Sequence, residues 1–265
     1  MVKKYYRKPH RYKRKKPIFR KRFFWLGILA LIIFAALFYS LIFLKNFQVE
    51  KIIVSGEEKV AKQELELLVE QRLENRILFF KTKSIFALNL GQMRHDILNS
   101  FPQIAGVEIS RDFFDAVNIV VTERQGVARW CGGEKCFLLD NEGVIFEEAA
   151  ETETSLVLIR TAKPSLTELG EIVIEKTFLS QIFEIKSRLA ADVKIAITEA
   201  ALVSEERLNM KTSEGWKIYF NLEGDLDWQL TELALVLEKQ ISPQKRGELE
   251  YIDLRFSRVY YKYQP

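Results

Sequence analysis

The strongest pattern along the chain is a run of 22 uncharged, mostly apolar residues, 23–44, bounded by Arg22 and Lys45. A helix rises about 1.5 Å per residue, so a run of this length reaches about 33 Å. The hydrocarbon core of a bilayer is about 30 Å thick, and a slightly tilted helix of this length crosses it. The run therefore predicts a membrane-spanning helix.

Residues 45–124 combine strand patterns with two helical stripes. A segment rich in β-branched and aromatic residues, 47–54, ends at the turn residues Ser55 and Gly56. Apolar residues then recur at helical spacing in two stripes, the second of which ends before Pro102, and two alternating strands follow. This order predicts a three-stranded sheet with two helices on one face. The stripes are Leu65, Leu68, Val69 and Leu73, then Leu90, Met93, Ile97 and Leu98, and the strands are 107–111 and 117–122.

Residues 125–265 are rich in short alternating segments, which indicates a β domain whose sheet has one buried and one solvated face. Two helical stripes interrupt the strands, and Asp225 or Asp227 is available as the N-cap of the second helix. We expect strands near Ala128, Phe137, Val144, Leu158, Ile195, Leu208 and Ile218, a closing pair at Ile252 and Val259, and helices marked by Leu179, Ile182, Phe183 and Leu189 and by Leu230, Leu233, Ala234 and Leu237.

Charge assigns these parts to the two sides of the membrane. The tail, 1–22, carries 12 Lys or Arg and no acid, whereas the rest of the chain has 28 basic against 36 acidic residues, a formal charge of −8. Basic flanks stay in the cytoplasm, so we expect a cytoplasmic tail and export of everything after the span. No small-x-small cleavage site follows the run, which indicates an uncleaved signal anchor. The expected parts are 1–22, 23–44, 45–124 and 125–265.

The basic tail suits two kinds of partner. Lys and Arg interleaved with Tyr5, Tyr6 and Tyr12 form one pattern of nucleic-acid binding. The same charges beside a span are already explained by topology and by attraction to anionic lipid, at about 1 kcal/mol per basic residue near the surface. We therefore expect a disordered tail that meets anionic lipid, and no nucleic acid.

Seven motifs follow the anchor, three in residues 47–124 and four in residues 127–255. Their order and spacing resemble the FtsQ/DivIB family of bacterial cell division proteins, in which a POTRA domain precedes a β domain. One departure is Gln125-Gly126, where the family commonly has proline. The motif residues are Phe47, Val49, Ile52, Val54 and Gly56; Phe101, Pro102, Ile104, Val107, Ile109 and Arg111; Ile119, Val121, Glu123 and Arg124; Val127, Ala128, Arg129 and Trp130; Leu139, Asp140, Gly143, Val144, Ile145 and Phe146; Gly215 and Trp216; and Tyr251, Ile252, Asp253, Leu254 and Arg255.

The resemblance implies an α+β chain with a single N-terminal transmembrane helix, a POTRA domain (β-α-α-β-β) over 45–124 and a mainly antiparallel β domain with helices over 125–265. It also implies a non-catalytic bitopic scaffold of the divisome, in the cell inner membrane at the septum, that recruits FtsB, FtsL and the septal wall synthesis machinery. Two other classes stay open: a membrane-anchored POTRA protein that guides polypeptide assembly or export, and an anchored hydrolase of the cell wall.

The last segment, 256–263, is the candidate partner site. If it forms an edge strand, its unpaired N–H and C=O groups can accept a strand from another protein, and its aromatic side chains can anchor that partner. The alternative is that these aromatics pack only within their own domain. The resemblance implies that FtsB with FtsL lies along this strand and the nearby helix. The candidate partner-binding residues are Arg255, Phe256, Ser257, Arg258, Val259, Tyr260 and Tyr261.

Motifs for catalysis and cofactors are scarce in the sequence. Cys131 and Cys136 flank a Gly-Gly hairpin tip and can reach disulfide geometry, although free thiols stay an open alternative. The only histidines, His10 and His95, lie on opposite sides of the expected span, so no metal site is expected. There is no phosphate loop, nucleophile elbow or dinucleotide glycine signature. We expect no cofactor and no enzyme activity.

Overall fold

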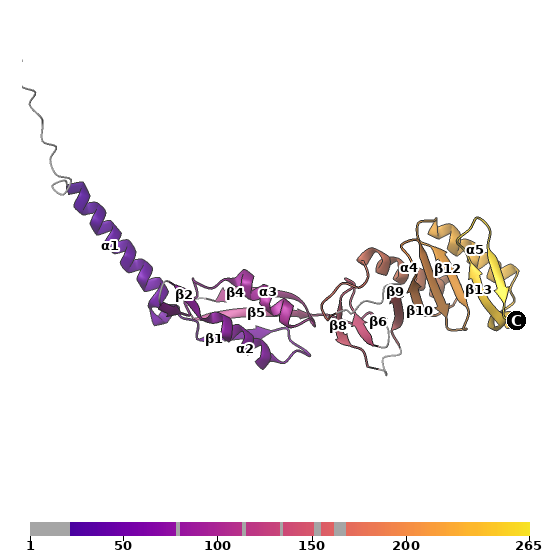
Figure 1. The fold of residues 1–265 in the computed structure, drawn as a ribbon, viewed down its shortest axis with the longest axis horizontal. Helices are drawn as coiled ribbons and strands as arrows, with labels where there is room; N and C mark the ends of the chain where they lie inside the picture. Colours follow the sequence, from indigo (N-terminus) through magenta and orange to yellow (C-terminus); the bar gives the residue numbers. More distant parts are fainter. Residues whose placement is uncertain (1–21, 78–79, 113–114, 133–134, 151–154, 162–167) are drawn as a thin grey trace, which may run out of the picture. The chain divides into compact units, whose positions relative to one another are not determined.

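A computed structural model describes residues 22–77, 80–112, 115–132, 135–150, 155–161 and 168–265 (Figure 1). Their contacts divide the chain into two compact units. The first contains the described residues of Met1–Ile53, Val69–Asn89 and Ser110–Asn118, and the second contains those of Val54–Leu68, Leu90–Ile109 and Ile119–Pro265.

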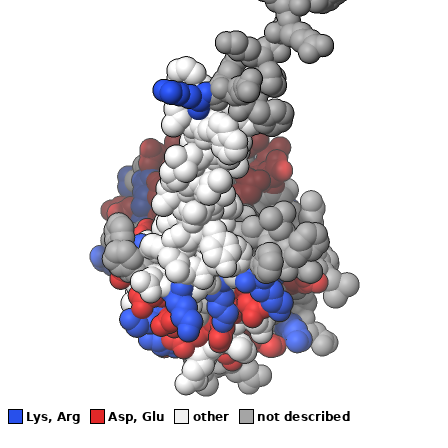
Figure 2. Space-filling view, turned by 90° about the vertical axis from the view of Figure 1, so that its left-hand side faces the viewer, with Lys and Arg blue, Asp and Glu red and all other residues white. Residues whose placement is uncertain are grey.

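Helix α1, Arg22–Phe43, is the predicted apolar helix, and its bounds differ from the sequence run by one residue at each end. Among its residues only Ile42 is buried against the rest of the chain. In the space-filling view the surface of this helix is uncharged between its start and its base (Figure 2). By length and composition it is the one candidate membrane span in the described part of the chain.

The elements that follow confirm the predicted β-α-α-β-β order. One sheet has the strand order β1-β5-β4. Leu65, Val69, Met93 and Ile97 from the two predicted stripes are buried, which explains why the helices form where they do. The elements are η2 (Lys45–Phe47), β1 (Lys51–Ser55), α2 (Lys62–Leu73), β2 (Asn75–Ile77), β3 (Phe80–Thr82), α3 (Leu90–Ser100), β4 (Ile104–Asp112) and β5 (Ala116–Glu123).

Two details of this region differ from the sequence pattern. The strand expected over 47–54 begins only at Lys51, because Lys45–Phe47 forms a 3-10 turn after the helix. A small hairpin of β2 and β3 lies between the two helices, and it was not predicted. Each of its strands has three residues, which is too short to display an alternating pattern.

The second half of the chain builds one nine-stranded sheet with the order β14-β13-β12-β11-β10-β9-β6-β7-β8 (Figure 1). Every strand and both helices expected from the pattern are present. The elements are β6 (Ala128–Cys131), β7 (Cys136–Leu139), β8 (Ile145–Glu148), β9 (Val157–Thr161), α4 (Lys176–Asp192), β10 (Ile197–Leu202), β11 (Arg207–Thr212), β12 (Lys217–Asn221), α5 (Leu226–Lys239), η3 (Pro243–Glu248), β13 (Leu249–Asp253) and β14 (Tyr260–Tyr263).

The large sheet is mainly antiparallel, as expected, but it is mixed. Five of its eight neighbouring pairs are antiparallel, and the pairs β9–β10, β12–β13 and β6–β9 are parallel. Helix α4 connects β9 to β10, and α5 connects β12 to β13. A helical crossover is the usual connection between parallel neighbours, so these two helices account for two of the parallel pairs.

Both helices contribute to the core of this sheet. Asp225, not Asp227, caps α5: its Oδ1 accepts the Trp228 N–H at 3.0 Å. Trp130 and Trp216 are the largest fully buried side chains. The helical residues in the core are Leu179, Ile182, Ile185 and Leu189 from α4 and Leu230, Leu233, Val236 and Leu237 from α5.

Candidate partner-binding edge

Strand β14 lies at one end of the large sheet. It pairs with β13 in an antiparallel register in which Asp253 faces Tyr260 and Ile252 faces Tyr261. No other strand in the described part of the chain pairs with its second side. In an antiparallel strand alternate residues direct their N–H and C=O groups to opposite sides, so the outer groups of β14 are available to a further strand.

The opposite end of the sheet is different, because a loop bonds to the start of its last strand, β8. Beyond β8, Val144 forms an isolated bridge with Ile172. Ile145 N–H donates to Glu171 O at 3.1 Å, and Gly170 N–H donates to Ile145 O at 2.7 Å. These bonds occupy backbone groups along the start of β8, so β14 is the more open edge of the sheet.

The sequence-predicted site residues form one continuous segment at the open edge. Residues 255–259 make a bend before β14, and only Tyr260 and Tyr261 belong to the strand, which is shorter than the expected 256–263. Phe256 is 54% exposed and Tyr260 is 55% exposed. Their rings meet edge to face with centroids 5.9 Å apart.

The aromatics of this segment divide between the two expected roles. Tyr263 packs against the core of its own domain, as does the aliphatic Val259. Phe256 and Tyr260 are directed to solvent, and Tyr261 is also exposed. Exposed aromatics grouped beside an unpaired strand are typical of a protein-binding surface.

Arg255 is held in a fixed position beside these aromatics. Its Nε donates to Asp253 Oδ1 at 2.8 Å, and its Nη2 donates to Asp253 Oδ2 at 2.5 Å. The guanidinium carbon lies 5.4 Å from the ring centroids of Tyr219 and Phe256. The hydrogen bonds that Arg255 donates to the Asp253 carboxylate raise the pKa of Arg255 above its ordinary value. The side chain is therefore a permanently charged group that both a carboxylate and two rings hold in place.

Phe256 lines two open hollows in the surface. The first, about 340 Å³, is lined by Tyr251, Asp253, Phe256 and Tyr260. The second, about 380 Å³, lies at the start of α5 and includes Trp228 and Arg255 in its lining. These hollows can take side chains of a partner strand that project from alternate positions.

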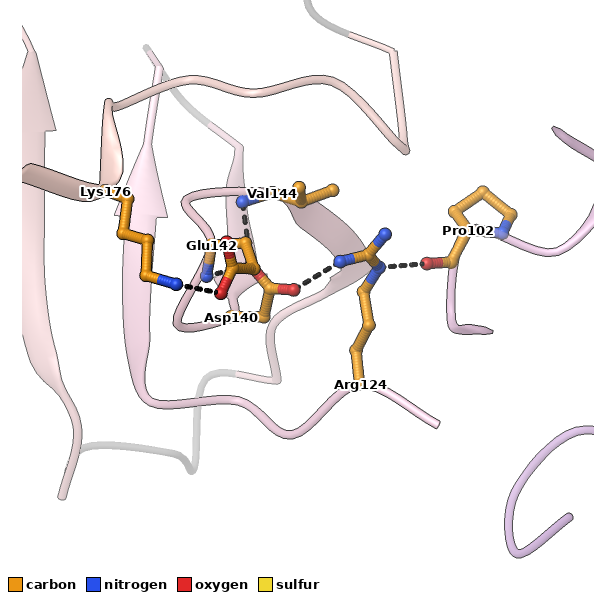
Figure 3. A network of polar contacts seen from close by, with 6 residues as sticks. All are labelled: Pro102, Arg124, Asp140, Glu142, Val144 and Lys176. Atoms are coloured by element: carbon orange, nitrogen blue, oxygen red, sulfur yellow. Dashed lines mark hydrogen bonds and ion pairs between the residues drawn. The ribbon is translucent and has the colours of Figure 1, made fainter. Parts of the chain in front are cut away.

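A buried ion pair forms a second polar site, which the sequence analysis did not predict (Figure 3). Arg124 donates from Nη1 to Asp140 Oδ2 and from Nε to Pro102 O, the latter at 3.0 Å. Asp140 Oδ1 also accepts the N–H groups of Glu142 at 3.0 Å and Val144 at 2.9 Å. The Asp140 side chain is 3% exposed, so its three partners replace water almost completely.

The remaining candidates fall outside both sites. Cys131 and Cys136 face each other across the β6–β7 hairpin and are joined by a disulfide in the structure. His95 is exposed on α3 and contacts Asn99 Nδ2 at 2.8 Å, while His10 and the rest of the basic tail lie outside the described residues. Within the described ranges no three His, Cys, Asp or Glu side chains are arranged to hold a metal ion.

Comparison with known proteins identifies the family. Residues 47–124 match the family model of the POTRA domain, FtsQ-type, and residues 128–255 match that of the cell division protein FtsQ/DivIB, C-terminal. The chain is 27% identical to the cell division protein DivIB of Clostridium acetobutylicum over 186 residues, which are 66% of this chain and 70% of that protein.

Two further relatives carry the name cell division protein FtsQ. The Neisseria gonorrhoeae protein is 27% identical over 158 residues, 59% of this chain and 58% of the relative. The Rickettsia bellii protein is 30% identical over 98 residues, 37% of this chain and 33% of the relative. The two matching domains cover most of the sequence that follows the apolar helix, and the chain therefore belongs to the FtsQ/DivIB family of cell division proteins.

Proposed function

We propose that this chain is a single-pass scaffold of the bacterial division machinery, in the inner membrane at the septum. Helix α1 crosses the membrane, residues 1–22 remain in the cytoplasm beside anionic lipid, and residues 45–265 are exported. The apolar helix, the basic tail that precedes it and the family support this assignment. The role is non-catalytic, in keeping with a family of structural division proteins.

The exported part binds its partners, FtsB-like and FtsL-like membrane proteins, by strand addition at β14. The observation that carries this proposal is the difference between the two ends of the sheet: residues 170–172 bond to Val144 and Ile145 at the start of β8, whereas the outer side of β14 has no strand neighbour among the described residues. A strand from the partner continues the sheet there through its own N–H and C=O groups.

Side chains add to this backbone pairing. Four residues of strand extend only about 13 Å, so β14 alone offers a short pairing surface. Phe256 and Tyr260 extend the contact before and along the strand, and Arg255 provides a fixed cation for an acidic group of the partner. Aromatic and Arg side chains commonly supply most of the binding energy, at about 2 kcal/mol or more each.

Charge substitutions at the exposed aromatics test the site. The full chain, in nanodiscs, is measured against an FtsB–FtsL complex from the same bacterium by pull-down and by binding titration. We expect Phe256→Lys and Tyr260→Lys to weaken binding by about tenfold or more each, since each loss of about 1.4 kcal/mol is tenfold in affinity. An unaltered far-ultraviolet circular dichroism spectrum confirms that the fold is intact.

Ile172→Lys is the matched control. Its side chain is 68% exposed, more than that of Phe256, but it belongs to the loop that bonds to the start of β8 at the other end of the sheet. This variant should bind like the parent chain. If all three variants bind with the affinity of the parent chain, β14 is rejected as the partner site. Release of fragments from purified wall material by the full chain would reject the non-catalytic role.

A further inference from the structure

The end of the apolar helix accepts hydrogen bonds from three side chains elsewhere in the first compact unit. Thr82 Oγ1 donates to Ile42 O at 2.7 Å, and Gln48 Nε2 donates to the same oxygen at 2.7 Å. Ser84 Oγ donates to Leu41 O at 2.9 Å. The last carbonyls of a helix have no partner within it, so these three groups satisfy acceptors where the helix leaves the membrane. Thr82 and Ser84 are buried, and this junction is therefore tightly packed.

These bonds set the depth of the residues beside the helix. A 22-residue helix is about 33 Å long, which places the carbonyls of Leu41 and Ile42 near the boundary of a hydrocarbon core about 30 Å thick. The headgroup layer beyond it is about 5 to 8 Å deep on each side. Phe86 follows Ser84 by two residues, so its Cα lies within about 7.6 Å of the Ser84 Cα. If α1 crosses the bilayer, the backbone of Phe86 is therefore within reach of the headgroup layer.

Phe86 is exposed although its turn is firmly held. The side chain is 57% exposed between Ile85 and Leu88, which are both buried. Arg111 fixes both ends of the turn: its Nε donates to Ile85 O at 2.7 Å, and its Nη2 donates to Leu88 O at 2.9 Å. Ile85 N–H also donates to Phe47 O at 2.9 Å. The Phe86 ring is thus exposed although the backbone of its turn is held in place.

Neighbouring side chains extend the surface around this ring. The rings of Phe47 and Phe86 have centroids 5.6 Å apart. Leu44, directly after α1, is 50% exposed, and Lys45 follows it on the surface. Lys83 lies one residue before Ser84; 38% of its side chain is exposed, and its Nζ lies 4.0 Å from Glu70 Oε1. An apolar and aromatic centre with basic neighbours suits the boundary between acyl chains and phosphate groups.

We propose that Leu44, Phe47 and Phe86 form a lipid-contact surface in the headgroup layer of the bilayer that α1 crosses, with Lys45 facing lipid phosphates and Lys83 at the margin of the surface. The inference rests on the proposed membrane span and not on partner binding. The chain then meets the membrane at two places, through α1 and through the Phe86 turn. Two contacts, joined by the hydrogen bonds of Thr82 and Ser84, fix the direction in which the first unit leaves the membrane.

Fluorescent labels in the full chain test this contact. Phe86→Cys, Lys83→Cys and Lys45→Cys are each labelled with nitrobenzoxadiazole and reconstituted into phosphatidylcholine–phosphatidylglycerol vesicles that carry a spin label at the lipid headgroup boundary. Ile172→Cys, an exposed apolar position in the other unit, measures background quenching, and the parent chain treated with the reagent measures labelling of its own cysteines. We expect blue-shifted emission at position 86, and lipid quenching at positions 86 and 83 above that at position 172.

The outcomes separate this inference from the proposed anchor. If the labels at 86 and 83 are quenched no more than the label at 172 while the label at 45 is quenched, the anchor stands and the lipid contact is overturned. If the label at 45 is also unquenched, the proposed span itself fails. Blue-shifted emission at 86 that escapes lipid quenching and disappears on dilution would assign the surface to a second copy of the chain and would also overturn the proposal.

Discussion

The Arg124–Asp140 pair gives a sharp prediction about stability, because a carboxylate with 3% exposure has three partners (Figure 3). Asp140→Ala removes the anion from a guanidinium that is itself only 16% exposed and leaves two backbone N–H groups without an acceptor. Breaking a buried pair in this way costs about 3 to 5 kcal/mol. Arg124 keeps its bond to Pro102 O and some solvent contact, so we expect about 3 kcal/mol.

Asp140→Asn separates the contribution of the ion pair from that of the backbone hydrogen bonds. The amide oxygen still accepts from Glu142 and Val144, whereas the charge opposite Arg124 is lost. We therefore expect a smaller cost, about 1 to 2 kcal/mol, because a charged hydrogen bond becomes a neutral one. The double variant Arg124→Met with Asp140→Asn should be more stable than the single variant Asp140→Ala. In the double variant no buried charge remains unpaired.

Urea unfolding of the full chain in detergent, followed by tryptophan fluorescence, measures these differences, since Trp130 and Trp216 are fully buried. The control is Lys176→Ala. It removes the neighbouring Lys176–Glu142 pair, whose side chains are 62% and 50% exposed, and should cost about 0 to 1 kcal/mol. If Asp140→Ala unfolds within about 1 kcal/mol of this control, the ion pair does not stabilise the fold as argued.

Two further predictions concern pH and oxidation. Burial tends to raise the pKa of Glu123, but the N–H groups of Val60, Glu58 and Lys59 outweigh it, so the pKa lies below its ordinary value of 4.5. The stabilisation by the Glu123 carboxylate is present above that value and is lost as the pH falls through the lowered pKa. When the pH is lowered from about 5 to about 3, the free energy of unfolding, measured by urea titration, should therefore fall less in Glu123→Gln than in the parent chain. For Cys131 and Cys136, a mass increase of the intact chain on reduction would establish the bond in protein from cells, and replacing both by serine should cost only about 2 kcal/mol because the ring is short.

Helices and strands could be predicted from the sequence where apolar residues recur periodically along one element. The helix α5 was predicted because Leu230, Leu233 and Leu237 return to one face, and the structure buries all three. A strand was predicted near Leu208 because apolar and polar residues alternate there, and in β11 the structure fully buries Leu208 and Met210. Such periodicity reports which face of an element lies inside, and it needs no knowledge of the neighbouring elements.

Contacts between residues far apart in the chain leave no periodic pattern in the sequence. The Arg124–Asp140 pair joins positions 16 residues apart, and the bond from Thr82 to Ile42 O spans 40 residues. The parallel pairing of β9 with β10 had a usable signal, because a helix was expected between those two strands. The position of Arg255 between Asp253 and two rings depends on β12 and β13 lying side by side, which the pattern of either strand alone does not determine.

An open edge strand is a hazard for any protein, because it can pair with unrelated strands, and β14 limits this in three ways. It is four residues long, its register with β13 shifts between Leu249 and Tyr251, and its centre carries Lys262, which is paired with Glu250 at 2.6 Å. A short, irregular and charged edge pairs poorly with a generic strand. Backbone pairing alone is then too weak to hold a partner, and stable binding needs a chain that also fills the hollows beside Phe256. The edge would supply a common backbone geometry, while Arg255 and the exposed aromatics would supply the selectivity.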